Sequence, residues 1–132
     1  MLIGLILATH GKLAEGILDA GSMIVGETNG VEVVSLIQEV GIEEFSRLLE
    51  VKVQRMVQEC TGVLILCDLQ GGTPFNCSLR LAMKKEYQAK LKVVAGLNLP
   101  MYIETLLARD KKKLDELADV ARESGKNGVQ AF

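Results

Sequence analysis

The sequence is poor in several residue types, and the first shortage concerns positive charge and aromatic rings. It has no tryptophan, two tyrosines and three phenylalanines, and its 15 basic and 17 acidic residues leave a formal net charge of −2. A protein that binds nucleic acid through the phosphate backbone needs an excess of positive charge. The densest basic run, residues 109–113, has no aromatic residues between its charges, and we expect a solvated helix start there. We therefore expect no nucleic-acid partner.

Long apolar runs are also missing. No stretch reaches the ~20 consecutive apolar residues of a membrane span. The apolar N-terminal run lacks the basic start of a signal peptide and ends in Thr-His-Gly rather than in a small-residue cleavage site. We therefore expect a cytoplasmic protein.

Cysteine and histidine are scarce. The three cysteines, Cys60, Cys67 and Cys77, form no CxxC pair, which is typical of reduced thiols in a cytosolic protein. Cys67 precedes a glycine-bearing loop, as in the phosphate loop of thiol phosphatases, but the arginine that such a loop needs is replaced by Thr73. We expect all three cysteines to be small buried hydrophobes. One histidine and dispersed carboxylates offer no cluster of metal ligands, so we expect neither a metal nor a cofactor.

The apolar residues that are present follow two alternating patterns. Uninterrupted apolar runs predict strands at residues 1–10, 31–37, 62–67 and 91–97, and apolar residues at spacings of three and four predict helices around residues 13–25, 45–57, 74–83, 103–108 and 114–121. In the third helix, Leu79, Ala82 and Met83 are expected to face inward. Strands separated by helices favour right-handed crossovers and a parallel sheet covered on both faces. We predict an α/β fold, a flavodoxin-like doubly wound sandwich with four parallel strands, and a single domain over residues 1–132.

The C-terminus does not fit this alternation. A turn is expected at Gly125-Lys126-Asn127-Gly128, and the apolar segment Gly128 to Phe132 follows it. A short terminal strand needs a sheet edge with which to pair. We therefore expect this fifth strand to pair with the sheet of another subunit.

The only histidine, His10, lies where the first apolar run ends and a turn begins at Gly11. In open α/β sheets, ligands bind at the carboxyl ends of the strands, which is where this pattern places His10. Histidine commonly serves as a nucleophile or a proton carrier there, although many histidines only cap a strand or bond a nearby carbonyl. Position alone therefore makes His10 a candidate and not more.

A second group of polar residues follows the third predicted strand. Asp68 ends that strand, Gly71 and Gly72 follow, Thr73 suits a helix N-cap, and Pro74 suits the first helical position. A helix N-terminus behind two glycines can bind an anion, whereas the simpler alternative is a well-capped helix after a flexible turn.

Asp68 and His10 are both expected at the same edge of the sheet, which favours the anion site. A carboxylate that accepts one imidazole N–H fixes the tautomer and leaves the other ring nitrogen as a nucleophile. Together with the helix N-terminus, the pair predicts phosphoryl transfer through a phosphohistidine.

Five short segments form a more specific pattern. They are Thr9-His10-Gly11, Asp68 with Gly71 to Asn76, Gly96 to Met101, Glu104 to Arg109, and Gly128-Val129. In this order, along essentially the whole chain, they resemble the IIA component of the mannose-family sugar phosphotransferase system.

The resemblance implies that His10 takes a phosphoryl group from phosphohistidine on the carrier HPr and passes it to a IIB component. IIB would phosphorylate a sugar during uptake through the membrane components IIC and IID, which chiefly choose the sugar. The resemblance also implies that Asp68 orients His10 and that Gly71, Gly72 and Thr73 contact the phosphoryl oxygens. The family forms a homodimer with exchanged C-terminal strands, which would account for Gly128 to Phe132.

Some positions depart from the family pattern. Lys12 replaces a bulky apolar residue, and Leu69-Gln70 is this chain's own variant, so both bear on the choice of docking partner. Arg109 either binds a partner or anchors a helix, and we favour the structural role.

Two other classes of function share features with this sequence. A receiver-like signalling domain with Asp68 as phosphoacceptor needs an acidic pair at the end of the first strand to hold magnesium, but the chain has Ala8-Thr9-His10 there. A regulatory module that binds a partner without transfer remains open, and only the presence of both His10 and Asp68 argues against it.

Overall fold

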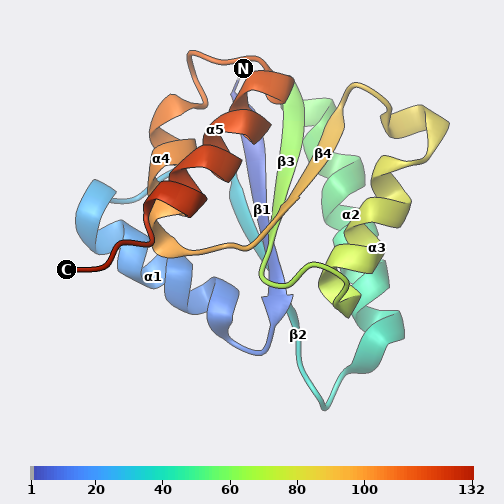
Figure 1. The fold of residues 1–132 in the computed structure, drawn as a ribbon. Helices are drawn as coiled ribbons and strands as arrows, with labels where there is room; N and C mark the ends of the chain where they lie inside the picture. The colour runs from blue at the N-terminus through green and yellow to red at the C-terminus, as the bar shows by residue number, and fades with distance from the viewer. Residues whose placement is uncertain (1) are drawn as a thin grey trace.

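The computed structural model describes residues 2–132, so Met1, which the first predicted strand included, lies outside the described residues. Strands and helices alternate along this part of the chain (Figure 1). In chain order they are β1 (Ile3–His10), α1 (Leu13–Val25), β2 (Val31–Leu36), α2 (Gly41–Glu59), β3 (Gly62–Cys67), α3 (Thr73–Ala82), the 3-10 helix η1 (Lys85–Tyr87), β4 (Leu91–Ala95), α4 (Leu99–Ala108) and α5 (Leu114–Asn127). Each predicted strand before the C-terminal segment is present, whereas η1 was not predicted.

The strands form one parallel sheet in the order β2-β1-β3-β4. The chain winds outward in one direction from β1 to β2 and in the other from β3 to β4. A crevice opens at such a reversal, at the carboxyl ends of the two central strands. The predicted flavodoxin-like, doubly wound α/β fold is therefore confirmed.

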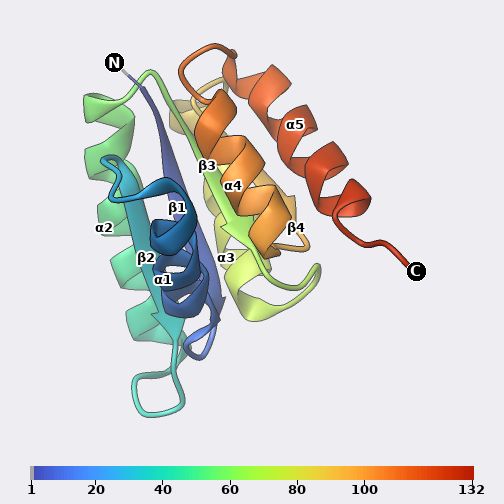
Figure 2. The ribbon, with the colours of Figure 1, turned by 90° about the vertical axis from the view of Figure 1, so that its left-hand side faces the viewer.

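Strand β1 shows why the sheet is covered on both faces. Its side chains alternate, so Leu5 and Leu7 pack in one core layer while Ile6 and Ala8 pack in the other, and all four are fully buried. The first layer contains side chains of α1, α4 and α5, and the second contains side chains of α2 and α3. Figure 2 shows the sheet between α2 and the α4–α5 pair. The residues that follow β1 and β3 are therefore held by a sheet that is buried on both faces.

Helix α3 buries a different face from the one predicted. Cys77, Ser78 and Leu81 are buried, whereas Leu79 and Met83 are 40% and 72% exposed. The expected inward positions of Leu79 and Met83 were therefore wrong. The prediction rested on the larger apolar side chains, but the small Cys77 and Ser78 allow this helix to lie close to the sheet, where Ser78 Oγ lies 3.5 Å from Cys67 Sγ. Ala82 is partly buried against the same core, as expected.

The C-terminal end also differs from the prediction. Gly125 to Asn127 form the last turn of α5 and not a turn between elements. A Cβ at Gly125 would lie 2.7 Å from Met101 Cε, so this glycine serves the close packing of α5 on α4. Residues 129–132 then lead away from the body without regular structure (Figures 1 and 2), and Val129 is 75% exposed. The fifth strand is not formed within one chain, and its exchange between subunits stays a prediction.

Arg109, at the end of α4, is buried near the amino end of the sheet, so the expected solvated start at residues 109–113 was wrong for this residue. Its Nη1 donates to the Gly30 carbonyl at 3.3 Å, and its Nη2 donates to the Asn29 carbonyl. Burial lowers the pKa of the Arg109 guanidinium from its ordinary value. Arg109 therefore ties α4 to the turn before β2, which is the structural role favoured by the sequence analysis.

No helix within residues 2–132 combines the length and apolar character that crossing a membrane requires.

Candidate functional site

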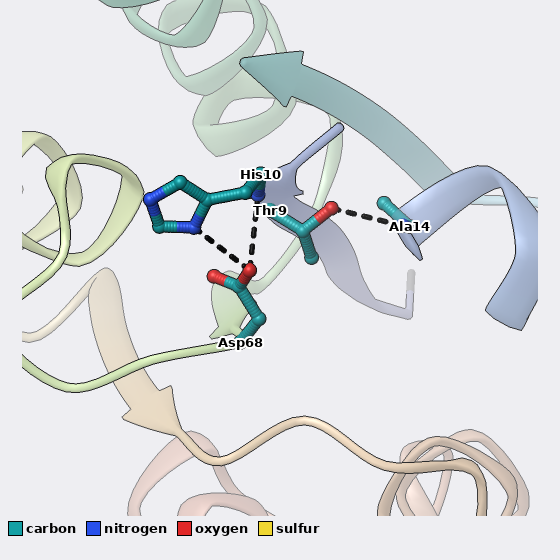
Figure 3. A network of polar contacts seen from close by, with 4 residues as sticks. All are labelled: Thr9, His10, Ala14 and Asp68. Atoms are coloured by element: carbon teal, nitrogen blue, oxygen red, sulfur yellow. Dashed lines mark hydrogen bonds and ion pairs between the residues drawn. The ribbon is translucent and has the colours of Figure 1, made fainter. Parts of the chain in front are cut away.

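The site lies where β1 and β3 end side by side. His10 is the last residue of β1 and Asp68 directly follows β3, as the sequence predicted. The two side chains meet: Nδ1 of His10 lies 2.9 Å from Oδ2 of Asp68 (Figure 3). The sheet therefore brings together two groups that are 58 positions apart in the sequence.

Asp68 holds His10 by two bonds to one oxygen. Besides the ring contact, Oδ2 accepts a hydrogen bond from the backbone N–H of His10 at 3.0 Å (Figure 3). This second bond was not predicted, because no sequence pattern reports the position of a backbone N–H relative to a distant carboxylate. The Asp68 side chain is 12% exposed and the His10 side chain 47% exposed. The carboxylate is thus a nearly buried support for a half-exposed ring.

This contact fixes which ring nitrogen is available. A carboxylate only accepts hydrogen bonds, so Nδ1 carries the proton of its bond to Asp68. In the neutral ring, Nε2 then keeps a lone pair, and it lies on the side of the imidazole away from Asp68. The ring is therefore oriented as a nucleophile at Nε2.

Thr9, which precedes His10, was not predicted as part of the site. Its hydroxyl oxygen accepts a hydrogen bond from the Ala14 N–H at 2.9 Å, and its side chain is fully buried (Figure 3). Lys12 occupies the N-cap position of α1 but makes no side-chain cap bond, so Thr9 supplies an acceptor for the first turn of that helix. The sequence did contain a signal for this role of Thr9. A hydroxyl residue stands just before the strand end, and the helix that follows has no capping side chain of its own. Thr9 therefore ties the end of β1, which carries His10, to the first turn of α1.

The loop after β3 brings the start of α3 to the same place. Gly71 has a φ of +83°, which favours glycine, and the Asn76 side chain donates to its carbonyl at 3.1 Å. Gly72, and not Thr73, is the N-cap residue of α3, so the prediction of Thr73 as N-cap was wrong. The extended backbone of Gly72 lets the helix begin one residue earlier, with Thr73 in its first turn.

No side chain caps this end of α3. The first intrahelical bond runs from the Asn76 N–H to the Gly72 carbonyl at 2.9 Å, and the backbone N–H groups before it lie at the positive end of the helix dipole. Gly72 is also the loop residue that packs against the His10 ring. The structure therefore places Gly72 beside the His10 ring, and the assignment of Gly71 and Thr73 to a phosphate site stays a prediction.

A cleft lies on another side of His10, toward the loop between β2 and α2. Its lining includes Lys12, Leu36, Ile37 and Ile42. Apolar side chains are exposed around the site, among them Ile42 and Leu69 with exposures of 57% and 60%. One side of His10 thus borders an open cleft whose lining includes apolar side chains.

The thiol beside the site is shielded from solvent. Cys67, directly before Asp68, is fully buried, and burial raises the pKa of its thiol to about 12. Cys77 is buried as predicted, Cys60 is partly buried, and all three cysteines are free. Within residues 2–132, no group of three or more His, Cys, Asp or Glu side chains is arranged to hold a metal ion.

The chain is similar to known components of one transport system. Residues 4–121 match the family EIIA-man, described as the phosphotransferase system fructose IIA component. The mannose-specific EIIAB component of Escherichia coli K12 is 36% identical over 133 aligned residues, which cover 100% of this chain and 40% of that protein. This chain thus spans less than half the length of that relative.

Two solved structures have the same fold over nearly the whole chain. The mannose/sorbose specific IIA subunit from Enterococcus faecalis is 36% identical, with a TM-score of 0.86, over 100% of this chain and 96% of that one. The phosphotransferase system component EIIA from Streptococcus agalactiae is 34% identical, with a TM-score of 0.85, over 98% and 97% of the two chains.

Proposed function

This chain belongs to the mannose-family IIA components of the sugar phosphotransferase system, and we propose that its His10 carries a phosphoryl group between two other components of that system. Proteins of this family are phosphotransferases. The donor in this proposal is the phosphohistidine of HPr, and the acceptor is a IIB component. The observation that carries the proposal is the 2.9 Å contact between His10 Nδ1 and Asp68 Oδ2, which leaves Nε2 as the nucleophile.

The step balances without water, metal or cofactor. The lone pair of Nε2 attacks the phosphorus, the nitrogen–phosphorus bond of the donor breaks, and its electron pair returns to the donor imidazole. The His10 ring gains positive character because its Nδ1 proton stays in place, and the carboxylate of Asp68 stabilises that charge. Transfer to IIB reverses the sequence of events, with His10 as the leaving group.

The start of α3 supplies the other half of the site in this proposal. A phosphoryl group on Nε2 brings negatively charged oxygens close to the loop at Gly71 and Gly72. The N–H groups at the N-terminus of α3 and the hydroxyl of Thr73 are the donors that we assign to these oxygens. No side chain caps this helix end, which leaves its first turn open to an anion.

The surroundings of His10 favour a protein partner. The half-exposed ring, the open cleft and exposed apolar side chains such as Ile42 and Leu69 suit contact with an apolar patch of another protein. HPr and IIB would dock here in turn, with Lys12, Leu69 and Gln70 at the rim influencing the choice between partners. We further propose one IIA domain over residues 1–132, a cytoplasmic location, and a homodimer with exchanged C-terminal segments.

The test follows the phosphoryl group through both steps. The protein is incubated with phosphorylated HPr, and intact mass shows whether it gains one phosphoryl group. Purified IIB is then added, and the group is expected to leave this protein and appear on IIB. Binding of HPr without any gain in mass would contradict transfer and support the alternative of a regulatory module.

A further inference from the structure

We infer that Gly72 is a positioning residue for His10. Because Gly72 has no side chain, the imidazole has room to lie in the position where it bonds to Asp68. The inference rests on the proposed function only for its kinetic consequence. The positioning itself concerns the geometry of the unphosphorylated protein.

The first observation is the lack of space between the loop and the ring. A Cβ built on Gly72 would lie 2.8 Å from Cε1 of His10 and 3.5 Å from Nε2. It would also lie 3.3 Å from the Leu69 carbonyl oxygen of the same loop, so the Cβ has little space on that side either. Real Cβ atoms essentially never approach another heavy atom closer than 3.0 Å. The ring and a side chain at position 72 therefore exclude each other.

The second observation is that the backbone does not require glycine at position 72. Its φ of −76° and ψ of 168° are extended values that any residue adopts. The neighbouring Gly71 is the opposite case, because its φ is +83° while a Cβ there would meet nothing within 4 Å. The two positions thus require glycine for different reasons. At Gly71 the reason is the backbone conformation, and at Gly72 it is the contact with His10.

The third observation is that the His10 ring cannot move without disturbing its hydrogen bond to Asp68. His10 is held on the other side by Asp68 Oδ2, which binds both its backbone N–H and Nδ1. Cε1 lies between the two ring nitrogens, so a displacement of this atom shifts Nδ1 relative to Asp68 and Nε2 relative to the start of α3. A displacement of several tenths of an ångström disturbs the geometry of the 2.9 Å contact between Nδ1 and Oδ2. Gly72 therefore acts through His10 and Asp68.

The test uses the fact that the chain has a single histidine. In 15N-labelled protein, long-range 1H–15N correlations of the imidazole come from His10 alone and report which ring nitrogen carries the proton. For wild type we expect the proton on Nδ1. For Gly72→Ala we expect a mixture of tautomers, and a rate of phosphoryl acceptance from phosphorylated HPr that falls about tenfold, as for the loss of one charge-assisted hydrogen bond.

Two other glycines provide matched controls. A Cβ at Gly16, on the exposed face of α1, meets nothing within 4 Å, so Gly16→Ala should leave tautomer and rate unchanged. A Cβ at Gly4, near the opposite end of β1, would lie 2.6 Å from Met56 Cε, so Gly4→Ala should lower the melting temperature. It should nevertheless keep the wild-type tautomer. This second control separates loss of stability from displacement of the ring.

A wild-type tautomer pattern in Gly72→Ala would overturn the inference. Global loss of the amide spectrum in that variant would also overturn it, because a clash confined to a half-exposed ring does not unfold the core. If wild type accepts no phosphoryl group while Gly72→Ala still changes the tautomer, the proposed function fails and the positioning role stands.

Discussion

Two polar side chains hold distant parts of this chain together, one at each end of the sheet. His10 at the carboxyl end binds Asp68, and Arg109 at the amino end binds the carbonyls of Asn29 and Gly30. The His10 side chain is 47% exposed, whereas Arg109 is 7% exposed. Both contacts fix geometry, but the His10 side chain is half-exposed while Arg109 is buried.

The difference separates a structural anchor from a reactive one. Arg109 is desolvated, and its guanidinium bonds to backbone carbonyls that would otherwise lose a donor. His10 is held on one side and open on the other, which is the condition that a nucleophile requires. The comparison therefore predicts that changes at His10 affect phosphoryl transfer, while changes at Arg109 affect stability.

The largest effect is expected for His10→Ala. Removing the only histidine should abolish phosphoryl acceptance, while the fold remains because the side chain lies at a strand end. Intact mass after incubation with phosphorylated HPr measures acceptance, and circular dichroism checks the fold. Acid-labile phosphate on the His10→Ala protein would remove His10 from the site.

Asp68→Asn is expected to slow transfer without stopping it. The amide oxygen can still accept the Nδ1 proton, but it no longer stabilises the positive charge that develops on the ring. The loss of a charge-assisted hydrogen bond costs about 1.5–3 kcal/mol, or roughly ten- to a hundredfold in rate. Single-turnover kinetics measures this change, and a wild-type rate would show that Asp68 plays no part.

Thr73→Ala should have a smaller effect than Asp68→Asn. The variant loses one neutral hydroxyl donor and keeps the backbone N–H groups of α3, so a decrease of about fivefold, near 1 kcal/mol, is expected. Thr61→Ala, at the exposed amino end of β3, is the matched control and should transfer at the wild-type rate. A decrease as large as that of Asp68→Asn would require a more direct role for Thr73.

Deleting residues 128–132 tests the proposed exchange and should leave transfer largely intact, because the site is built from β1 and β3 of one chain. The apolar side chains of this segment, including the exposed Val129 and Phe132, have no burial within their own chain. We expect the deletion to shift the protein toward monomer in sedimentation experiments. A truncated protein with the same dimer dissociation constant would show that the segment does not join the subunits.

The smallest effect on transfer is expected for Arg109→Met, which keeps an apolar stem and removes the donors. The free energy of unfolding should fall by about 1.5–3 kcal/mol because the Asn29 and Gly30 carbonyls lose a charged donor, while the transfer rate per folded molecule stays at the wild-type value. Arg122→Met is the matched control: its side chain is 66% exposed, so its effect on stability should stay within about 0.5 kcal/mol. A slower transfer by Arg109→Met would contradict the assignment of a structural role to Arg109 and a reactive role to His10.

Much of the fold was predictable because it depends on patterns along the chain. Strand β3 was predicted with its observed bounds, since six apolar residues stand between Thr61 and Asp68. The meeting of His10 and Asp68 followed from topology, because parallel strands end at the same edge.

What could not be predicted depends on distances between segments. The buried face of α3 is set by how closely Cys77 and Ser78 approach the sheet, and not by the hydrophobicity of Leu79. Two contacts of His10 also depend on distances between segments. One is the hydrogen bond from its backbone N–H to Asp68, and the other is the contact of its ring with Gly72. Such contacts are visible only once the backbone is placed.

The central claim is that Nε2 of His10 is the reactive atom, and NMR of the phosphorylated protein tests it most directly. Because the chain has one histidine, 15N–31P coupling identifies the phosphorylated nitrogen without ambiguity of residue. We expect coupling to Nε2 and a proton retained on Nδ1. Coupling to Nδ1, or a phosphoryl group on any other residue, would contradict the account.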